Sequence, residues 1–526
     1  MTRNPHELFQ ELMALGPVSS IAPADGLERI GVLIDLSGDL RRAEGTDRAL
    51  EWADQVEKQR LSARHAALLE FFRANAWDNR RALRHSDVES AWEWQQPELQ
   101  RQIFHLRRAL QHPGFKSLSR LRRCQILTNL ANSLSLLGRP VDAIATWTHA
   151  LSINPHFGMA LGNRGYGLMR YASGLHDSRG RSILLYFAHK DLTVALSSRA
   201  KYAGKSQPFA IQFFADKKLE IEKIINISRA DRTIRVDGYP TGASKEESHY
   251  REWVLFNHLF LNPLNELGYH TIAASDPLSL PSYTTPIGDP PTLIGFFNQM
   301  KQEYVSARWL LYDGLHVDRV HFSDCRVTLF NTLDYPAYSV GVEKMKAAYR
   351  IAYSLFDKIA FFLNDYASLG VKSREVYFKT IWYENGDAKK GVIRKQFLTK
   401  NLPLRGLYWV SKDLFDPEFQ DVMEPEAREL YAIRNHLEHS YLKVHEILAP
   451  RAHQEKFDKA WIDRLAYSVS RSVFEEKTLK VFRLARAALI YLALGMHREE
   501  RLRARGKRKV KVMPMALPIL EDRWKK

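Results

Sequence analysis

The chain has only two cysteines, Cys124 and Cys325, and they lie far apart in 526 residues. This count excludes a disulfide framework and a zinc site built from cysteines. We therefore expect a reducing compartment, and the cytoplasm is the simplest one.

Long apolar runs are also lacking. The most apolar late stretch, Ala487–Met496, is about half as long as a helix that spans a bilayer. The first residues, Met1–Glu7, do not contain the apolar core of a signal peptide. We expect no membrane attachment.

Several sequence motifs of well-known enzyme classes are absent. The chain has no G-x-S-x-G element and no H-E-x-x-H site, which excludes the common serine hydrolases and zinc proteases. The stretch Gly242–Ser248 lacks the glycine and lysine spacing of a phosphate loop. No cofactor is predicted.

Acidic residues are fewer than basic ones. The sequence has 60 Asp and Glu residues and 77 Lys and Arg residues, which gives a formal charge of +17 and an isoelectric point near 9.6. Basic side chains gain affinity for polyanions by releasing phosphate counterions. Nucleic acid is therefore the favoured partner, ahead of a membrane surface.

The apolar periodicity is helical over most of the chain and predicts an all-α protein. The length suits three or four domains of roughly 150 residues, although Leu27–Leu36 could include a short strand or buried turn. We expect a helical region, a mainly helical connector with long loops, a helical bundle and a basic tail. Their predicted ranges are 1–170, 171–340, 341–500 and 501–526.

One segment in the first region, Leu127–Pro155, has a specific pattern. Small and large apolar residues recur on two helices that flank Gly138, and Pro155 closes the unit. The pattern resembles a tetratricopeptide repeat, and Leu99–Gly114 and Gly158–Leu168 resemble degenerate neighbours. The resemblance implies that this region docks a protein partner or senses a trigger. The alternative is an ordinary helical hairpin.

The bundle is predicted from three long apolar stripes and a shorter one. The first stripe runs from Met345 to Tyr366 and ends before Gly370, a short helix is expected near Leu404–Phe415, and the last stripe covers Trp461–Leu494. The third long stripe predicts a helix from about 424 to 448. Its apolar positions are Leu430, Ile433, Leu437, Tyr441, Val444 and Leu448.

That helix carries the candidate catalytic residues Arg434, Asn435 and His439. Histidine titrates near neutral pH and can move the proton of a ribose 2′-hydroxyl, while a guanidinium can bind a phosphate through two parallel hydrogen bonds. Asn435 and His439 are four residues apart and share a face. Arg434 and His439 are separated by about 140° and roughly 7.5 Å along the helix.

The pattern Arg434-Asn-x-x-x-His439 resembles the R-x(4–6)-H motif of the HEPN superfamily, and Ser354–Asn364 resembles its first helix. The resemblance covers roughly residues 342–500. It implies a metal-independent endoribonuclease in bacterial defence or a toxin system, with an RNA substrate such as tRNA or mRNA. Asp357 is a further candidate, with a surface or supporting role as the alternative.

The angle between Arg434 and His439 favours a homodimer. A twofold axis could bring the arginine of one chain beside the histidine of the other. The basic tail is a candidate substrate-binding arm through Lys507, Arg508 and Lys509, or else a solvated charge run.

Other interpretations stay open. Arg434 could form a surface ion pair with Glu438. His436, His439 and His445 could approach one metal ion, although no carboxylate or cysteine stands at a useful helical offset, and we predict no metal site. The whole chain could be a non-enzymatic tetratricopeptide adaptor with an RNA- or nucleotide-binding dimerisation domain. It could also be a nucleotide-binding regulatory module without turnover.

Overall fold

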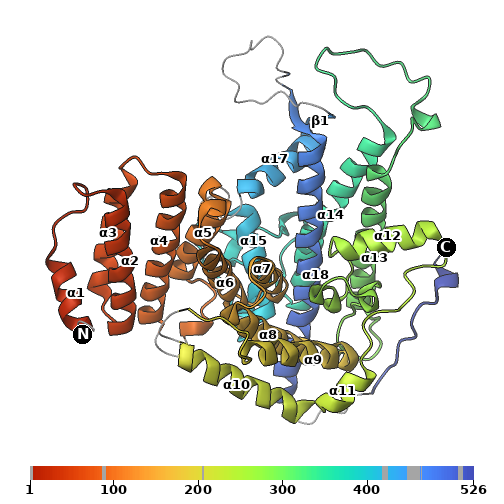
Figure 1. Ribbon diagram of the computed structural model, residues 1–526. Coiled ribbons are helices and arrows are strands. Elements are labelled where there is room, and N and C mark those ends of the chain that lie inside the picture. Colours follow the sequence, from red (N-terminus) through yellow and green to blue (C-terminus); the bar gives the residue numbers. More distant parts are fainter. Residues whose placement is uncertain are drawn as a thin grey trace.

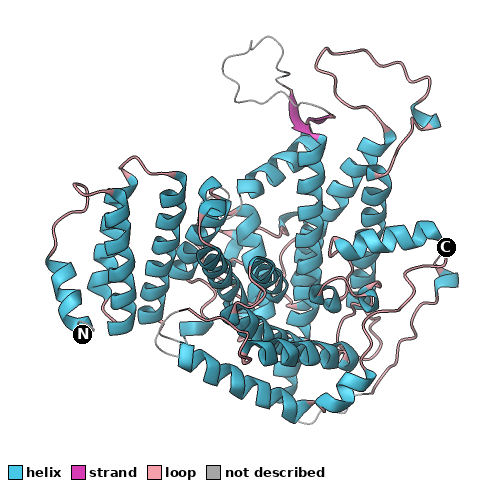
Figure 2. Cartoon of the chain, in the orientation of Figure 1, coloured by secondary structure: helices cyan, strands magenta, loops and turns pink. Residues whose placement is uncertain are grey.

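A computed structural model describes residues 4–85, 90–203, 207–416, 425–446, 463, 465–506 and 513–525. Within these ranges nearly all regular structure is α-helix, with two short strands that pair with each other (Figure 2). The all-α prediction is confirmed.

The first part of the chain is an array of helices that pack against one another in sequence order (Figure 1). Side chains of Asn4, Ser62, Ser119 and Asp177 cap free N–H groups where four of these helices begin. The array consists of α1 (Pro5–Ala14), α2 (Pro23–Leu40), α3 (Ala43–Glu57), α4 (Ala63–Arg84), α5 (Pro97–Gln111), α6 (Arg120–Leu136), α7 (Pro140–Ile153), α8 (Gly158–Gly174), α9 (Ser178–Ala195) and α10 (Gln207–Ile224).

The expected strand or buried turn at Leu27–Leu36 is wrong, because the whole stretch belongs to α2. Its buried residues Leu27, Ile30 and Ile34 recur at helical steps of three and four. The helical period is easier to recognise over the full length of α2, which extends beyond Leu27–Leu36 on both sides.

The predicted helix pair around Gly138 is present as α6 and α7, which pack as neighbours. Gly138 adopts a φ of +86° at the turn between them, a conformation that favours glycine. The apolar positions expected to face inward are all buried: Leu130, Ala131, Leu134, Ala143, Trp147 and Ala150. The assignment of this pair to the tetratricopeptide family stays a prediction.

The connector contains α11 (Ile227–Thr233), α12 (Lys245–Phe256) and α13 (Thr292–Leu315). Between the last two helices the chain is mostly irregular, with short 3-10 turns at Pro263–Leu267 and Thr271–Ala273. A buried ion pair holds this segment on α13, since a guanidinium nitrogen of Arg308 lies 2.7 Å from Asp276 Oδ2.

The bundle contains α14 (Val340–Tyr366), α15 (Leu402–Phe415), α17 (Pro425–His439) and α18 (Arg471–Gly506). The long helix α18 runs through the centre of the molecule and packs against both α14 and α15 (Figure 1). It also contacts α8, so the array and the bundle share a packed boundary.

Two boundaries of the bundle helices are wrong in the sequence prediction. The helix expected to reach about residue 448 ends at His439, and Tyr441–His445 is strand β1. Strand β2, Ala466–Ser470, lies inside the helix expected from Trp461, so α18 begins only at Arg471. The two strands pair in parallel, with Tyr441 opposite Ala466.

A polar joint connects the array to the bundle; it is formed by Arg107, Arg139, Asp142, Asp413 and Tyr491. Asp413 on α15 is 1% exposed and ion-pairs with both arginines, with 3.1 Å from its Oδ2 to Arg107 Nη2. The Tyr491 hydroxyl donates to Asp142 Oδ2 over 2.6 Å.

The backbones meet closely beside this joint. A Cβ atom on Gly406 would lie 2.2 Å from the carbonyl oxygen of Gly138. Only a glycine fits at that point of α15 without moving the α6–α7 turn. The turn is thereby fixed against the bundle.

Candidate functional site

Helix α17 is held on α14 through its own backbone. The Tyr349 hydroxyl donates to the Leu430 carbonyl over 2.6 Å, and Arg350 Nη2 donates to the Leu437 carbonyl over 2.7 Å. The second contact satisfies a carbonyl in the last turn of α17, which has no partner within the helix. Together the two contacts fix the position of the motif residues between Leu430 and Leu437.

Arg434 lies half-buried on α17 and faces Tyr353 and Asp357 of α14. Burial raises the pKa of Asp357, while the Phe378 N–H and the charge of Arg434 act in the opposite direction. Burial likewise raises the pKa of Tyr353, and Arg434 opposes that shift. We call this group of Tyr353, Asp357 and Arg434 the α14–α17 face.

The guanidinium of Arg434 makes no ion pair with any described carboxylate. Its Nη1 donates to Asn435 Oδ1 over 3.2 Å. The surface ion pair with Glu438, one of the alternatives from sequence, does not form in the described structure.

His439 is the last residue of α17 and is exposed, whereas Asn435 is half-buried. The three predicted catalytic residues share one helix, as expected. No contact joins Arg434 to His439 in the described structure, which agrees with their separation around the helix axis.

Tyr353 was not found from the sequence, although it stands four residues before Asp357 on the same predicted helix. That spacing places both side chains on one face and was the available signal. The Tyr353 hydroxyl is buried without a hydrogen-bond partner among the described residues. Asp357 Oδ1 accepts from the Phe378 N–H over 2.9 Å, which ties the carboxylate to the segment that follows α14.

The other histidines of the motif stretch have structural contacts. His436 Nδ1 donates to the Ala432 carbonyl over 2.8 Å, and its ring lies 5.1 Å from that of Tyr467. His445 lies on β1, is 1% exposed, and its Nδ1 donates to the Asp334 carbonyl over 3.0 Å. The interpretation that placed His436, His439 and His445 on one helix is therefore wrong.

Strand β1 is held beside the motif by a buried charge cluster. Lys443, 4% exposed, lies 2.6 Å from Asp334 Oδ2 and 2.9 Å from Asp463 Oδ2. Burial lowers the pKa of the Lys443 ammonium, but the two carboxylates outweigh it and raise the pKa overall. These ion pairs hold Lys443 in strand β1, directly after the end of α17, and favour the extended backbone over a continued helix.

The remaining predicted site residues, Lys507, Arg508 and Lys509, lie outside the described residues. Among the described helices, none combines the length and apolar character that a bilayer crossing requires.

Comparison with known proteins identifies a family for the C-terminal part of the chain. The family model described as LA2681-like HEPN matches residues 284–499, a region that contains α14, α17 and the α14–α17 face. No curated protein and no solved structure matches the chain. A HEPN domain points to an RNA-related function. Residues 284–499 therefore carry an LA2681-like HEPN domain.

Proposed function

We propose that the HEPN domain is a metal-independent endoribonuclease that cleaves RNA by attack of a ribose 2′-hydroxyl on the neighbouring phosphate. The 2′-oxygen forms a bond to phosphorus, and the bond to the 5′-oxygen of the next nucleotide breaks. The products are a 2′,3′-cyclic phosphate and a free 5′-hydroxyl. The reaction needs one proton removed and one returned, together with a cation at the phosphate.

The observation that carries the proposal is the state of Arg434. It is half-buried on the matched domain, lies next to Asp357, and has no ion pair with a described carboxylate. A guanidinium that contacts a neighbouring amide and forms no ion pair within the described part of the chain suits a phosphate. His439, exposed at the end of the same helix, is assigned the proton transfers.

Arg434 and His439 make no contact with each other in the described structure, and five residues on a helix separate them by about 140°, so the proposal includes a homodimer with a composite site. Asn435, on the same face as His439, would donate a hydrogen bond to the RNA. The substrate class is tRNA or mRNA, the setting is cytoplasmic bacterial defence or a toxin system, and the helical array docks the partner or trigger. These last assignments rest on the resemblances described above.

The test is cleavage of end-labelled RNA by the purified full chain in the presence of EDTA. We expect cleavage with cyclic-phosphate ends, and its loss in His439→Ala. The control is His436→Gln, which removes a neighbouring imidazole on the same helix and should keep cleavage. RNA binding without cleavage by the wild-type protein would favour the non-enzymatic adaptor, and activity that requires added metal would contradict the mechanism.

A further inference from the structure

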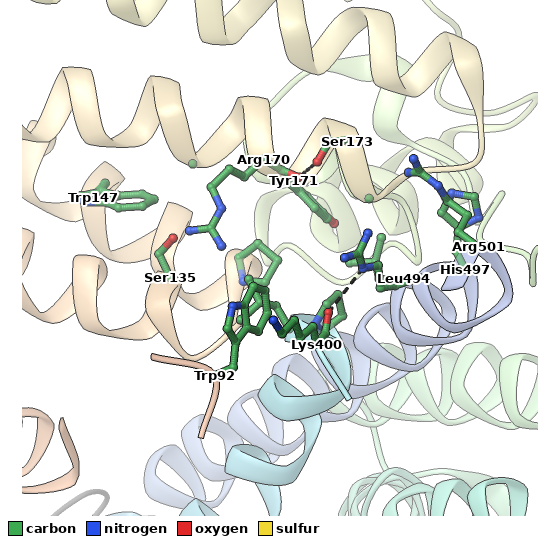
Figure 3. Close-up of a pocket in the computed structure, with 17 residues that line it drawn as sticks. Trp92, Ser135, Trp147, Arg170, Tyr171, Ser173, Lys400, Leu494, His497 and Arg501 are labelled. Carbon is green, nitrogen blue, oxygen red and sulfur yellow. Dashed lines mark hydrogen bonds between the residues drawn. The ribbon is translucent and has the colours of Figure 1, made fainter. Parts of the chain in front are cut away.

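A cationic hollow lies at the boundary between the array and the bundle, away from the α14–α17 face. It has a volume of about 240 Å³ and is bordered by α6, α7, α8, the start of α15 and the end of α18 (Figure 3). Of its described lining residues none is acidic. Five are basic: Arg170, Lys400, His497, Arg498 and Arg501.

The positive charge of this hollow is only partly opposed by carboxylates: Glu499 acts on Arg498 but lies in ion-pair contact with Arg503, at 3.8 Å. In the described structure Arg170, Arg498 and Arg501 make no ion pair, and the adjacent Glu500 is occupied with Tyr366 and Arg503 at 2.8 and 3.1 Å. Figure 3 shows the Arg170 side chain reaching from α8 toward Ser135 and Trp92.

The pKa values of neighbouring groups reflect the crowding of cations. Burial, and then the charge of Arg170, lowers the pKa of Arg405 to about 10. Burial also lowers the pKa of Arg498, with Arg501 and Arg505 acting in the same direction. An anion in the hollow would relieve this repulsion.

A second hollow, of about 330 Å³, adjoins the first and shares Ser135, Trp147 and Arg170 with it. Its lining is rich in carboxamides: Gln102, Asn129, Asn132 and Asn163. Gln102 is 5% exposed, and its Oε1 has no hydrogen-bond partner among the described residues. A buried acceptor without a partner costs free energy unless a ligand supplies a donor.

We propose that the two hollows together bind a nucleotide, with its phosphates between Arg170, Arg498 and Arg501 and its base against the carboxamides of Gln102 and Asn163. Guanidinium groups bind phosphate oxygens through paired hydrogen bonds. Carboxamides carry a donor and an acceptor and can pair with the edge of a base.

The sizes and charges favour this ligand over other occupants. Small-molecule sites occupy about 300–1,000 Å³, and the two hollows together fall within that range. The chain's own segment after Gly506 begins Lys-Arg-Lys and would be repelled by the cationic hollow. A free nucleotide and the phosphorylated end of an RNA share the required chemistry.

A bound nucleotide would bridge the two parts of the molecule. Arg170 belongs to α8 in the array, while Arg498 and Arg501 belong to α18 in the bundle. The hollow is also bordered by the start of α15, which packs against the motif helix α17. The site therefore lies where a ligand can act on the position of α17.

The test is isothermal titration calorimetry of the full chain with ATP, GTP, AMP, pyrophosphate and adenosine, followed by RNA oligonucleotides with and without a 5′-phosphate. We expect nucleotides to bind more tightly than pyrophosphate or adenosine alone. Arg170→Gln combined with Arg501→Gln should weaken nucleotide binding by about tenfold or more. Asn163→Leu should weaken nucleotide binding and leave pyrophosphate binding unchanged.

The matched control is Arg503→Gln, which removes the same charge from α18. Arg503 does not line the hollow and is paired with Glu500, so its removal should leave binding unchanged. Thermal unfolding of each variant verifies the fold. Failure of every nucleotide and of the 5′-phosphorylated RNA to bind at millimolar concentration would overturn the proposal, as would undiminished binding in the folded double variant. Binding of the 5′-phosphorylated RNA alone would identify an RNA end as the source of the ligand. None of these results depends on RNA cleavage.

Discussion

Two regions of the molecule contain buried or half-buried arginines and differ in whether those arginines form ion pairs. At the joint, Arg107 and Arg139 both ion-pair with Asp413, and all three side chains are buried. At the α14–α17 face, Arg434 is half-buried beside Asp357 but forms no ion pair with a described carboxylate.

The difference fits a structural role for the arginines of the joint and the proposed catalytic role for Arg434. The joint neutralises its arginines because burial of an unpaired charge costs several kcal/mol. The α14–α17 face leaves Arg434 half-buried and without an ion pair to a described carboxylate. Under the proposed function, a phosphate of the RNA supplies the anion. Stability should depend on the first region and activity on the second.

The largest effect on stability is expected for Asp413→Ala. The substitution removes the carboxylate that two buried guanidinium groups share, while Arg139 keeps its ion pair with Asp142 over 2.9 Å, and it should cost about 3 kcal/mol of unfolding free energy. Chemical denaturation measures it. The control is Asp47→Ala, which breaks an exposed pair with Arg80 and should cost about 1 kcal/mol or less. Equal losses in the two variants would show that the buried charges of the joint contribute no more to stability than an exposed ion pair.

The opposite behaviour is expected for Arg434→Lys. The positive charge stays, but an ammonium cannot form the paired contacts of a guanidinium, so RNA cleavage should fall by roughly 100-fold. The unfolding free energy should change by less than about 0.5 kcal/mol, since no ion pair is lost. Arg374→Lys, on an exposed side chain of the same domain, is the control for cleavage. A large loss of stability in Arg434→Lys would assign this arginine a structural role.

The sequence predicted the parts of both regions that depend on local periodicity. The stripe from Met345 to Tyr366 is the main part of α14. The short helix expected at Leu404–Phe415 is α15, which begins two residues earlier, at Leu402. A buried helical face repeats every three or four residues and is visible without knowledge of the partner. Arg434, Asn435 and His439 were placed on one helix for the same reason.

Features that depend on distant partners were not predictable. Strand β1 pairs with a strand 25 residues further along, where Tyr441 meets Ala466, and its apolar residues continued the helical stripe by chance. The joint brings Arg139 to Asp413 across 274 positions, and no local pattern marks either residue. Tyr353 lies opposite Arg434 only because α14 and α17 pack together.

The third prediction concerns the sharing of the site between two chains. Arg434→Ala and His439→Ala protomers should each be inactive alone. When they are mixed in equal amounts, half of the dimers are mixed, and each has one of two composite sites intact. About a quarter of the wild-type cleavage rate should return. Light scattering at the assay concentration gives the oligomeric state. A fully active monomer would contradict the composite site and leave the roles of the two residues standing.

The smallest effect concerns the scaffold behind the α14–α17 face. Burial lowers the pKa of His445 below its ordinary value of 6.5. The folded state therefore disfavours the protonated imidazole, whereas the same side chain takes up a proton readily in the unfolded chain. The stabilisation is complete above about pH 6.5 and is lost as the pH falls toward the lower folded-state pKa. Between pH 7 and pH 5 the wild-type protein should therefore lose on the order of 1 kcal/mol more unfolding free energy than His445→Gln, whose side chain cannot titrate.

Other buried histidines titrate equally in both proteins and cancel in the difference. The exposed His316→Gln serves as the control, and denaturant unfolding at each pH measures the three slopes. Parallel slopes for the wild-type and His445→Gln proteins would show that β1 opens to solvent before the domain unfolds.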